Sequence, residues 1–273
     1  GRKVEQLRKH RRIDRDAEAV LRIGGLPAAS MEATELVVRR GEVAGLYGVV
    51  GCGRERIARA IVGLEPARDV RLYLRGVAFQ PRSPAHAAQA GIAYLPAGRA
   101  DNCILPTLSI RENLTLTQLR QFGRGGVVAA SAERDAACTQ LAWLRVKYDD
   151  EEAPIVALSG GNQQKVLIGR VMGMAKNLLV LEDPTAGIDV AAKHEIHHLI
   201  RGKAERDGLA VLLLSSDLLE TLLVCDSLYT VFKGSLVRRY EPLNEAMYED
   251  VLSDVLGGRA AGGVPAAGSP VGG

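Results

Sequence analysis

The sequence is poor in the features that mark secreted and membrane-spanning proteins. Its 273 residues include four cysteines, which are widely spaced and form no C-x-x-C pair. This spacing argues against a disulfide framework or a zinc ribbon and favours free thiols in a reducing cytoplasm. The longest apolar runs, such as LAVLLL at 209–214, are far shorter than the roughly 20 residues that cross a bilayer. Because no secretory signal pattern opens the chain, we expect a soluble intracellular protein or a piece of one.

An excess of charge of one sign is also lacking. The 35 basic and 32 acidic residues leave a net charge of +3, too small to indicate nucleic acid or an anionic membrane surface as a partner. Residues 1–17 are dense in charge, but both signs are interspersed, which favours a solvated linker over a basic arm. Residues 257–273 are rich in Gly, Ala and Pro and predict a disordered tail. The globular part is therefore expected at 18–256.

Between these ends, strand and helix patterns alternate. Apolar runs that suit strands of a buried parallel sheet occur at 42–48, 91–96, 177–183 and 209–216. Residues 70–76 predict a further strand in a small antiparallel piece. Helical patterns lie at 54–63, 109–121, 131–144, 160–174, 190–204 and 217–223, and those within 105–175 predict a helical insertion. The alternation predicts an α/β layered fold.

A glycine-rich loop between a predicted strand and a predicted helix is the first candidate site. GVVGCGRE, at 48–55, nearly matches G-x-x-x-x-G-K-[ST], a loop whose backbone amides wrap phosphates. Gly48, Gly51 and Gly53 are present, but Arg54 stands where lysine belongs and Glu55 where the hydroxyl that holds Mg²⁺ belongs. Taken alone, the pattern fits a plain glycine turn at least as well as a phosphate site.

The string LSGGNQQK, at 158–165, is more specific. Ser159 can cap a helix whose first amides belong to Gly160, Gly161 and Asn162, and such a start can bind an anion. A capped helix in a flexible loop is the alternative. The string resembles the signature motif of ABC-type ATPases. Its asparagine is similar to the carbohydrate-importer branch for ribose, galactose and xylose, whose ATPase carries two ABC domains in one chain.

The flanking segments agree with this resemblance, which covers roughly residues 1–255. Residues 178–193 resemble the Walker B strand and D-loop, with Asp189 in the D-loop position, and residues 211–220 resemble the switch segment. Arg54 and Glu55 resemble the altered phosphate loop of the second domain of those tandem ATPases. The resemblance implies a P-loop NTPase core, RecA-like and of ABC type, with a helical subdomain and a small antiparallel β piece.

The resemblance also implies roles for the residues at the loop's own site, and several depart from the family. Glu182 and Asp183 reverse the family order of Asp then Glu, Ala97 stands at the Q-loop position, and Ser216 replaces the switch histidine. Magnesium is expected only weakly, through Glu55 or Glu182. Residues 18–40 contain no aromatic side chain that could stack on adenine. We expect weak ATP binding and slow or absent hydrolysis at this site.

ABC domains work in head-to-tail pairs, so the resemblance implies that this chain contributes half of two ATP sites. Its signature is expected to complete the site of a second ABC domain through Ser159, Gly160, Gly161, Asn162 and Gln163. The implied cofactors are ATP and Mg, and the implied partners are membrane permease subunits and, indirectly, a sugar-binding protein, with no nucleic acid. The expected place is the inner face of the cell membrane. A non-catalytic regulatory or structural ABC-like domain and an autonomous ATPase remain as alternatives.

HEIHH at 194–198 matches the zinc pattern H-E-x-x-H, with His194, His198 and the acid Glu195. The same residues fit a plain helix whose apolar stripe is Ile196, Leu199 and Ile200. No third ligand is evident, so we expect a structural helix without zinc.

Overall fold

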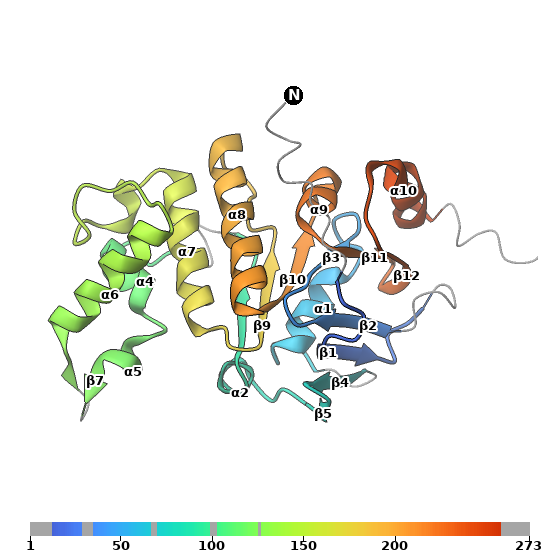
Figure 1. Ribbon diagram of the computed structural model, residues 1–273, viewed down its shortest axis with the longest axis horizontal. Helices are drawn as coiled ribbons and strands as arrows, with labels where there is room; N and C mark the ends of the chain where they lie inside the picture. Colours follow the sequence, from blue (N-terminus) through green and yellow to red (C-terminus); the bar gives the residue numbers. More distant parts are fainter. Residues whose placement is uncertain (1–12, 29–34, 67–69, 99–102, 125–126, 258–273) are drawn as a thin grey trace, which may run out of the picture.

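The fold is built around two sheets and a helical arm (Figure 1). The computed structural model describes residues 13–28, 35–66, 70–98, 103–124 and 127–257. Most of the predicted linker and nearly all of the predicted tail lie outside these residues.

The larger sheet has six strands in the order β12-β11-β3-β10-β9-β6. Their bounds are β3 Val43–Tyr47, β6 Ile92–Leu95, β9 Leu178–Glu182, β10 Ala210–Ser215, β11 Ser227–Phe232 and β12 Ser235–Tyr240. Neighbouring strands are parallel except β12, which runs antiparallel to β11. Four of these strands coincide within about one residue with apolar runs of the sequence, because strands buried on both faces carry little polarity. The predicted α/β fold is confirmed.

A smaller antiparallel sheet has the order β2-β1-β4-β5. It consists of β1 Ala19–Gly24, β2 Glu35–Arg39, β4 Arg71–Leu74 and β5 Val77–Ala78. The strand predicted at 70–76 is β4, paired antiparallel with β1 as expected. Tyr229 of β11 ties the two sheets together, since its hydroxyl bonds the backbone of Val37 on β2.

The helices lie between and beyond the strands. Those around the sheets are α1 Arg54–Ile61, α2 Pro84–Gln89, α8 Val190–Asp207, α9 Leu218–Val224 and α10 Tyr248–Leu256. The arm consists of α4 Ile110–Thr115, α5 Leu119–Phe122, α6 Ala130–Trp143 and α7 Gly160–Met174, with a short hairpin of β7 Gly123–Arg124 and β8 Val127–Val128. Single-turn helices η2 Ile155–Ala157 and η3 Glu245–Met247 complete the set. None of the described helices is both long and apolar enough to cross a membrane.

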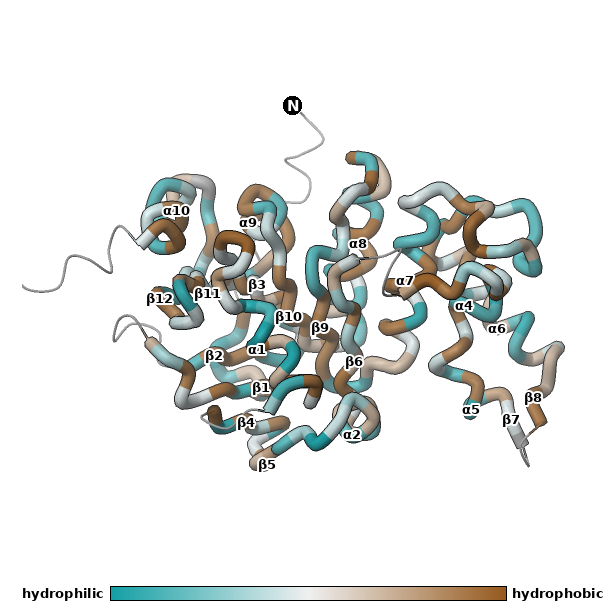
Figure 2. The backbone as a smooth tube through the Cα atoms, turned by 180° about the vertical axis from the view of Figure 1, so that it is seen from behind, coloured by the Kyte–Doolittle hydropathy of each residue, from teal (hydrophilic) through white to brown (hydrophobic). Residues whose placement is uncertain are grey.

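Three apolar clusters form the core. One packs between the two sheets and includes α1 residues, and a second covers the other face of the large sheet beneath α7, α8, α9 and α10. The third holds the arm together through α4, α6 and α7. Figure 2 shows hydrophobic segments along the large sheet, with more hydrophilic colour at the outer helices. The arm therefore has a core of its own, joined to the sheet by α7.

Candidate functional site

The carboxyl ends of the parallel strands bring the first group of candidate residues together. The glycine loop follows β3, Ala97 follows β6, Asp183 follows β9 and Ser216 follows β10. Because these strands are parallel, their carboxyl ends meet at one edge, which is where α/β sheets commonly bind ligands.

The glycines of the loop are required by its backbone. A side chain at Gly48 would lie 2.5 Å from the Cys52 sulfur and 2.6 Å from the Val231 carbonyl oxygen. Gly51 and Gly53 have φ values of +79° and +97°, which disfavour other residues. Gly53 is also the N-cap of α1, and no side chain caps that helix. The loop thus leads tightly from β3 into the start of α1.

Arg54 turns into the molecule. Its side chain is 2% exposed, and one terminal nitrogen donates to the carbonyl oxygens of Gly48 at 2.8 Å and Ser215 at 2.6 Å. The other terminal nitrogen lies 3.0 Å from a carboxylate oxygen of Asp183. Its Nε lies 3.4 Å from Glu55. The guanidinium therefore joins the loop, the end of β9 and the end of β10.

Asp183 is fully engaged in the same network. One carboxylate oxygen accepts from Arg54, and the other accepts from the Ser216 amide at 2.7 Å and the Ser216 hydroxyl at 2.9 Å. Its backbone has a φ of +40°, which aspartate tolerates better than most residues. Asp183 and Ser216 thus bond each other, and each carboxylate oxygen of Asp183 has a partner within the chain.

Glu182 lies beside this network, and its side chain is buried. One oxygen accepts from the Ala97 amide at 3.3 Å, and the Tyr94 hydroxyl also bonds this carboxylate. Burial raises the pKa of Glu182, an effect that these hydrogen bonds and Arg59 only partly offset. Its Oε1 has no hydrogen-bond partner among the described residues. That oxygen could serve a cation.

The described residues fit a resident metal poorly and a substrate-bound magnesium better. They contain no group of three or more His, Cys, Asp or Glu side chains arranged around a metal. Magnesium in phosphate sites takes one or two carboxylates and fills the rest with phosphates and water. Glu182 offers one available oxygen for that arrangement, whereas Glu55 is close to the Arg54 cation.

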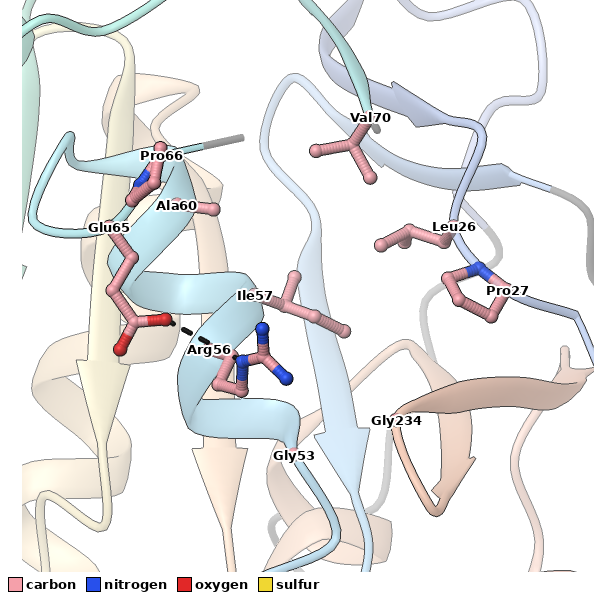
Figure 3. A pocket seen from close by; sticks show the side chains of 10 residues that line it. All are labelled: Leu26, Pro27, Gly53, Arg56, Ile57, Ala60, Glu65, Pro66, Val70 and Gly234. Atoms are coloured by element: carbon pink, nitrogen blue, oxygen red, sulfur yellow. Dashed lines mark ion pairs between the residues drawn. The ribbon is translucent and has the colours of Figure 1, made fainter. Parts of the chain in front are cut away.

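A pocket adjoins the loop on the side of α1 (Figure 3). Leu26 and Pro27, which follow β1, face Ile57 of α1 across it, with Val70 at its end. Arg56 and Glu65, an ion pair at 3.6 Å, lie at the α1 side. None of the described residues that line this pocket is aromatic, so a planar base here would contact aliphatic groups and lack the favourable geometry of ring stacking.

The signature residues form a second group at the start of α7. Ser159 is the N-cap, but its hydroxyl does not cap the helix as predicted. It accepts from the Asn162 side-chain amide at 3.0 Å, while the Asn162 oxygen accepts from the Lys147 amide at 3.1 Å. Gln163 donates to the Leu158 carbonyl at 3.1 Å. Asn162 therefore fixes this turn by linking the Ser159 hydroxyl to the Lys147 amide.

Gly161 brings the signature against the D-loop helix. A side chain there would lie 2.5 Å from the Ala192 Cβ, so α7 and α8 touch at their first turns. Asp189 caps α8 by accepting from the Ala192 amide at 2.9 Å. In Figures 1 and 2, α8 lies between α7 and β10, and the signature is thus separated from the loop's own site within one chain.

The HEIHH segment has a different role from the zinc pattern. Glu195 pairs with the buried Lys165 of α7, and His197, which the pattern does not use, bonds the buried Glu220 at 2.6 Å. Sequence reasoning missed Lys165, His197 and Glu220 as partners. The sequence did offer a sign of them, because each is a polar or charged residue at a helix position that periodicity places toward the core.

Comparisons with known proteins agree with this geometry. The family described as ABC transporter matches residues 31–186. The chain is 37% identical over 237 residues to the ribose import ATP-binding protein RbsA of Chelativorans sp., covering 86% of this chain and 47% of that protein. It is 42% identical over 197 residues to a putative ribose/galactose/methyl galactoside import ATP-binding protein of Agrobacterium fabrum, covering 72% and 39%. The arabinose import ATP-binding protein AraG of Chromohalobacter salexigens is 39% identical, with 87% and 48% covered. The chain thus spans about half or less of the length of these relatives.

Solved structures show the same fold. An ATP-binding cassette of an ABC transporter in its ADP conformation superposes with a TM-score of 0.69 at 20% identity, covering 91% of this chain and all of that one. A dimeric cassette in a post-hydrolysis state bound to ADP and Pi gives 0.67 at 17% identity, covering 82% and 99%. The predicted P-loop NTPase fold of ABC type is confirmed.

Proposed function

Since the chain belongs to the ABC transporter family, we propose that it is an ATP-binding domain of a carbohydrate importer and works as one half of a head-to-tail pair. In this proposal the loop's own site is degenerate, and the signature at the start of α7 completes the ATP site of a partner domain. The sugar-import names of the relatives support the substrate class.

The burial of Arg54 is the main observation in support of a degenerate ATP site at the loop. Each terminal nitrogen of its guanidinium already bonds a carbonyl or carboxylate oxygen of the chain. A phosphate at the loop would have to compete with Asp183 and two backbone carbonyls for that charge. Glu55 adds a negative charge beside the same place, which costs on the order of 4 kcal/mol per like-charge pair at about 4 Å before screening. Weak ATP binding follows.

Slow or absent hydrolysis follows from the neighbouring residues. A general base must reach the water that it activates, and a water at Asp183 would compete with the hydrogen bonds that this carboxylate already accepts from Arg54 and Ser216. Ala97 has no polar side chain that could hold a water molecule, and its backbone amide bonds Glu182. When ATP binds, magnesium would supply positive charge to its phosphates, and Glu182 is the residue that would hold it.

The signature supports the other half of the proposal. Asn162 holds the Ser159 hydroxyl, so the turn before α7 is preorganised, and the amides at the start of a 15-residue helix favour an anion. Aimed at a partner's γ-phosphate, these amides would stabilise the charge that develops during phosphoryl transfer.

Apolar side chains are exposed in the segments that carry both proposed half-sites, and they support a protein partner. They are Val50 at 83% exposed in the loop, Val156 at 57% before the signature, Val190 at 71% at the start of α8 and Leu219 at 59% on α9. A second ABC domain that contacts these segments would cover them. In the importer, permease subunits and indirectly a sugar-binding protein would complete the assembly, which places this domain on the inner face of the membrane.

A non-catalytic regulatory or structural domain is the second candidate. The same Arg54 network favours it, because a site closed by its own residues needs no nucleotide to be stable. It differs from the first candidate in one respect, because a structural domain would leave a partner's turnover unchanged.

ATP turnover of the chain alone and in a pair tests the proposal. Purified residues 1–273 should release phosphate at background, and turnover should appear when a first ABC domain with complete Walker motifs is added. Turnover of order 1 s⁻¹ by the chain alone, within the usual enzyme range, would instead support an autonomous ATPase. No stimulation of the partner would support the structural reading.

A further inference from the structure

Four buried polar side chains meet behind the switch segment. Their hub is Glu220 of α9, and the others are Thr185 after β9, His197 of α8 and Ser215 at the end of β10. Each is less than 5% exposed. Buried polar groups are costly unless paired, so such a cluster is held for a reason beyond packing.

Glu220 accepts from all three neighbours. The Thr185 hydroxyl donates to Oε1, and His197 Nε2 lies 2.6 Å from the same oxygen. The Ser215 hydroxyl donates to Oε2 at 2.7 Å. Burial alone raises the pKa of Glu220, but these three hydrogen bonds outweigh it and hold the pKa below its ordinary value. The hub is therefore a carboxylate, and it depends on its donors.

Glu220 bonds residues of both chain segments that adjoin Asp183. Thr185 lies two residues beyond Asp183 on the chain leaving β9. Ser215 precedes Ser216, which bonds Asp183, and its own carbonyl accepts from Arg54. A shift of Glu220 would therefore move the two segments that fix the Asp183 carboxylate.

Helix α8 joins this edge to the signature. On the switch side it contributes His197 to the hub and Lys193 to an ion pair with Asp217 at 2.7 Å. On the other side its Glu195 pairs with the buried Lys165 of α7, whose ammonium also donates to the Arg145 carbonyl at 2.8 Å. The first turns of α7 and α8 touch at Gly161, where no side chain fits. The helix is thus fastened along both sides.

We propose that Glu220 and His197 are positioning residues for the ATPase reaction of the pair. Their hydrogen bond fixes the sheet edge that carries Asp183 to α8, and α8 in turn sets the position of the signature on α7. The link within the chain stands on the geometry alone, and its effect on turnover rests on the proposed function. Because α8 is bonded on both sides, we expect that removing the His197–Glu220 hydrogen bond makes the start of α7 more mobile as well.

Amide hydrogen exchange of the purified full chain tests the link without a partner. His197→Leu removes a donor from a buried carboxylate, and opening should become about tenfold easier both at 183–189 and at 163–168. His197→Gln restores a donor at similar reach and should return both segments to their normal rates. His198→Ala, an exposed neighbour on the same helix, is the control and should change neither. In the reconstituted pair, His197→Leu should lower kcat about tenfold with KM for ATP unchanged, and His197→Gln should restore it.

Faster exchange at 183–189 with no change at 163–168 would overturn the proposal, because the two segments would then be independent. Equal effects of His197→Leu and His197→Gln would overturn it as well. If His197→Leu does not fold, Thr185→Val removes another donor of Glu220 while keeping the side-chain shape, and the same two segments decide. A coupled exchange result with unchanged turnover in an active pair would overturn the positioning role, whereas a pair in which even the unmodified chain gives no turnover would place the failure in the proposed function.

Discussion

The positive charge of Arg54 is paired with oxygens of its own chain. Four oxygens from the loop, from β10, from Asp183 and from Glu55 lie within 3.4 Å of its nitrogens. A lysine ammonium could not reproduce this planar set of contacts, since it is a compact charge with rotatable donors. The residue therefore acts as a structural cross-link at the place where a phosphate loop normally meets its ligand.

Arg54→Lys tests whether restoring the family residue restores activity. We expect no hydrolysis by the chain alone, because the Asp183 and Ala97 positions would still lack groups that orient water. Loss of the guanidinium hydrogen bonds should lower the free energy of unfolding by about 1–3 kcal/mol. Phosphate release and urea unfolding measure the two effects. Measurable ATP turnover from this variant alone would show that Arg54 is the sole defect of the site.

Glu182→Gln tests the effect of burying a carboxylate without full pairing. Burial raises the pKa of Glu182, so the folded chain binds its proton more tightly than the unfolded chain does. The folded state is then favoured at low pH, and stability is lost as pH rises from the unfolded value through the folded pKa. The glutamine variant should therefore be more stable than the parent at pH 7 and should lose that advantage below pH 4.5.

Urea midpoints at pH 4 and pH 7 measure this difference. Glu249→Gln, at an exposed position on α10, is the matched control and should show no such pH-dependent gain. A glutamine at 182 that weakens the fold at pH 7 would mean that the ionised carboxylate is stabilising there.

At the scale of elements, α7 and α8 carry the residues of the proposed second half-site. Asp189 caps α8 at its start, and Gly208, with a φ of +68°, ends it. The contact between the two helices depends on Gly161, whereas Gly202, farther along α8, faces the flexible end of Arg206. The two glycines therefore differ in what a methyl group would meet.

Gly161→Ala and Gly202→Ala form a matched pair. At Gly161 the new methyl would overlap the Ala192 Cβ, so we expect a loss of about 1–3 kcal/mol in stability from overpacking. At Gly202 the methyl displaces only a side chain, and the gain in helix propensity should stabilise the fold by up to about 1 kcal/mol. Thermal unfolding of both variants gives the comparison. Equal shifts would mean that α7 and α8 do not pack closely at Gly161.

Sequence patterns predicted the helices and strands whose formation depends on neighbouring residues in the chain. The signature helix was predicted at 160–174 and occurs there, because a serine-glycine-glycine start and an apolar stripe define it. Strands β11 and β12 were missed, since their mixed composition makes sense only within the sheet, where β11 pairs with β3 and β12 pairs with β11. The burial of Arg54 could not be foreseen, because its partners Asp183 and Ser215 lie 129 and 161 residues away.

At the scale of the whole molecule, the proposed function gives the chain two half-sites, which α8 joins. The loop, Asp183 and Ser216 close on themselves, while the start of α7 presents amides beside exposed apolar residues. This asymmetry means that the activity of the chain should depend on a partner. It also means that damage at the signature should be visible only in the pair.

Phosphate release by the reconstituted pair carrying Ser159→Arg tests this account most directly. A bulky side chain at the start of α7 would occupy the place proposed for the partner's γ-phosphate, so turnover should fall at least about 100-fold. Circular dichroism should show an unchanged fold, because Ser159 is exposed. Val77→Arg, at an exposed position of β5 in the other sheet, is the control and should leave turnover unchanged. Equal turnover of the Ser159→Arg pair and the unmodified pair would contradict the account.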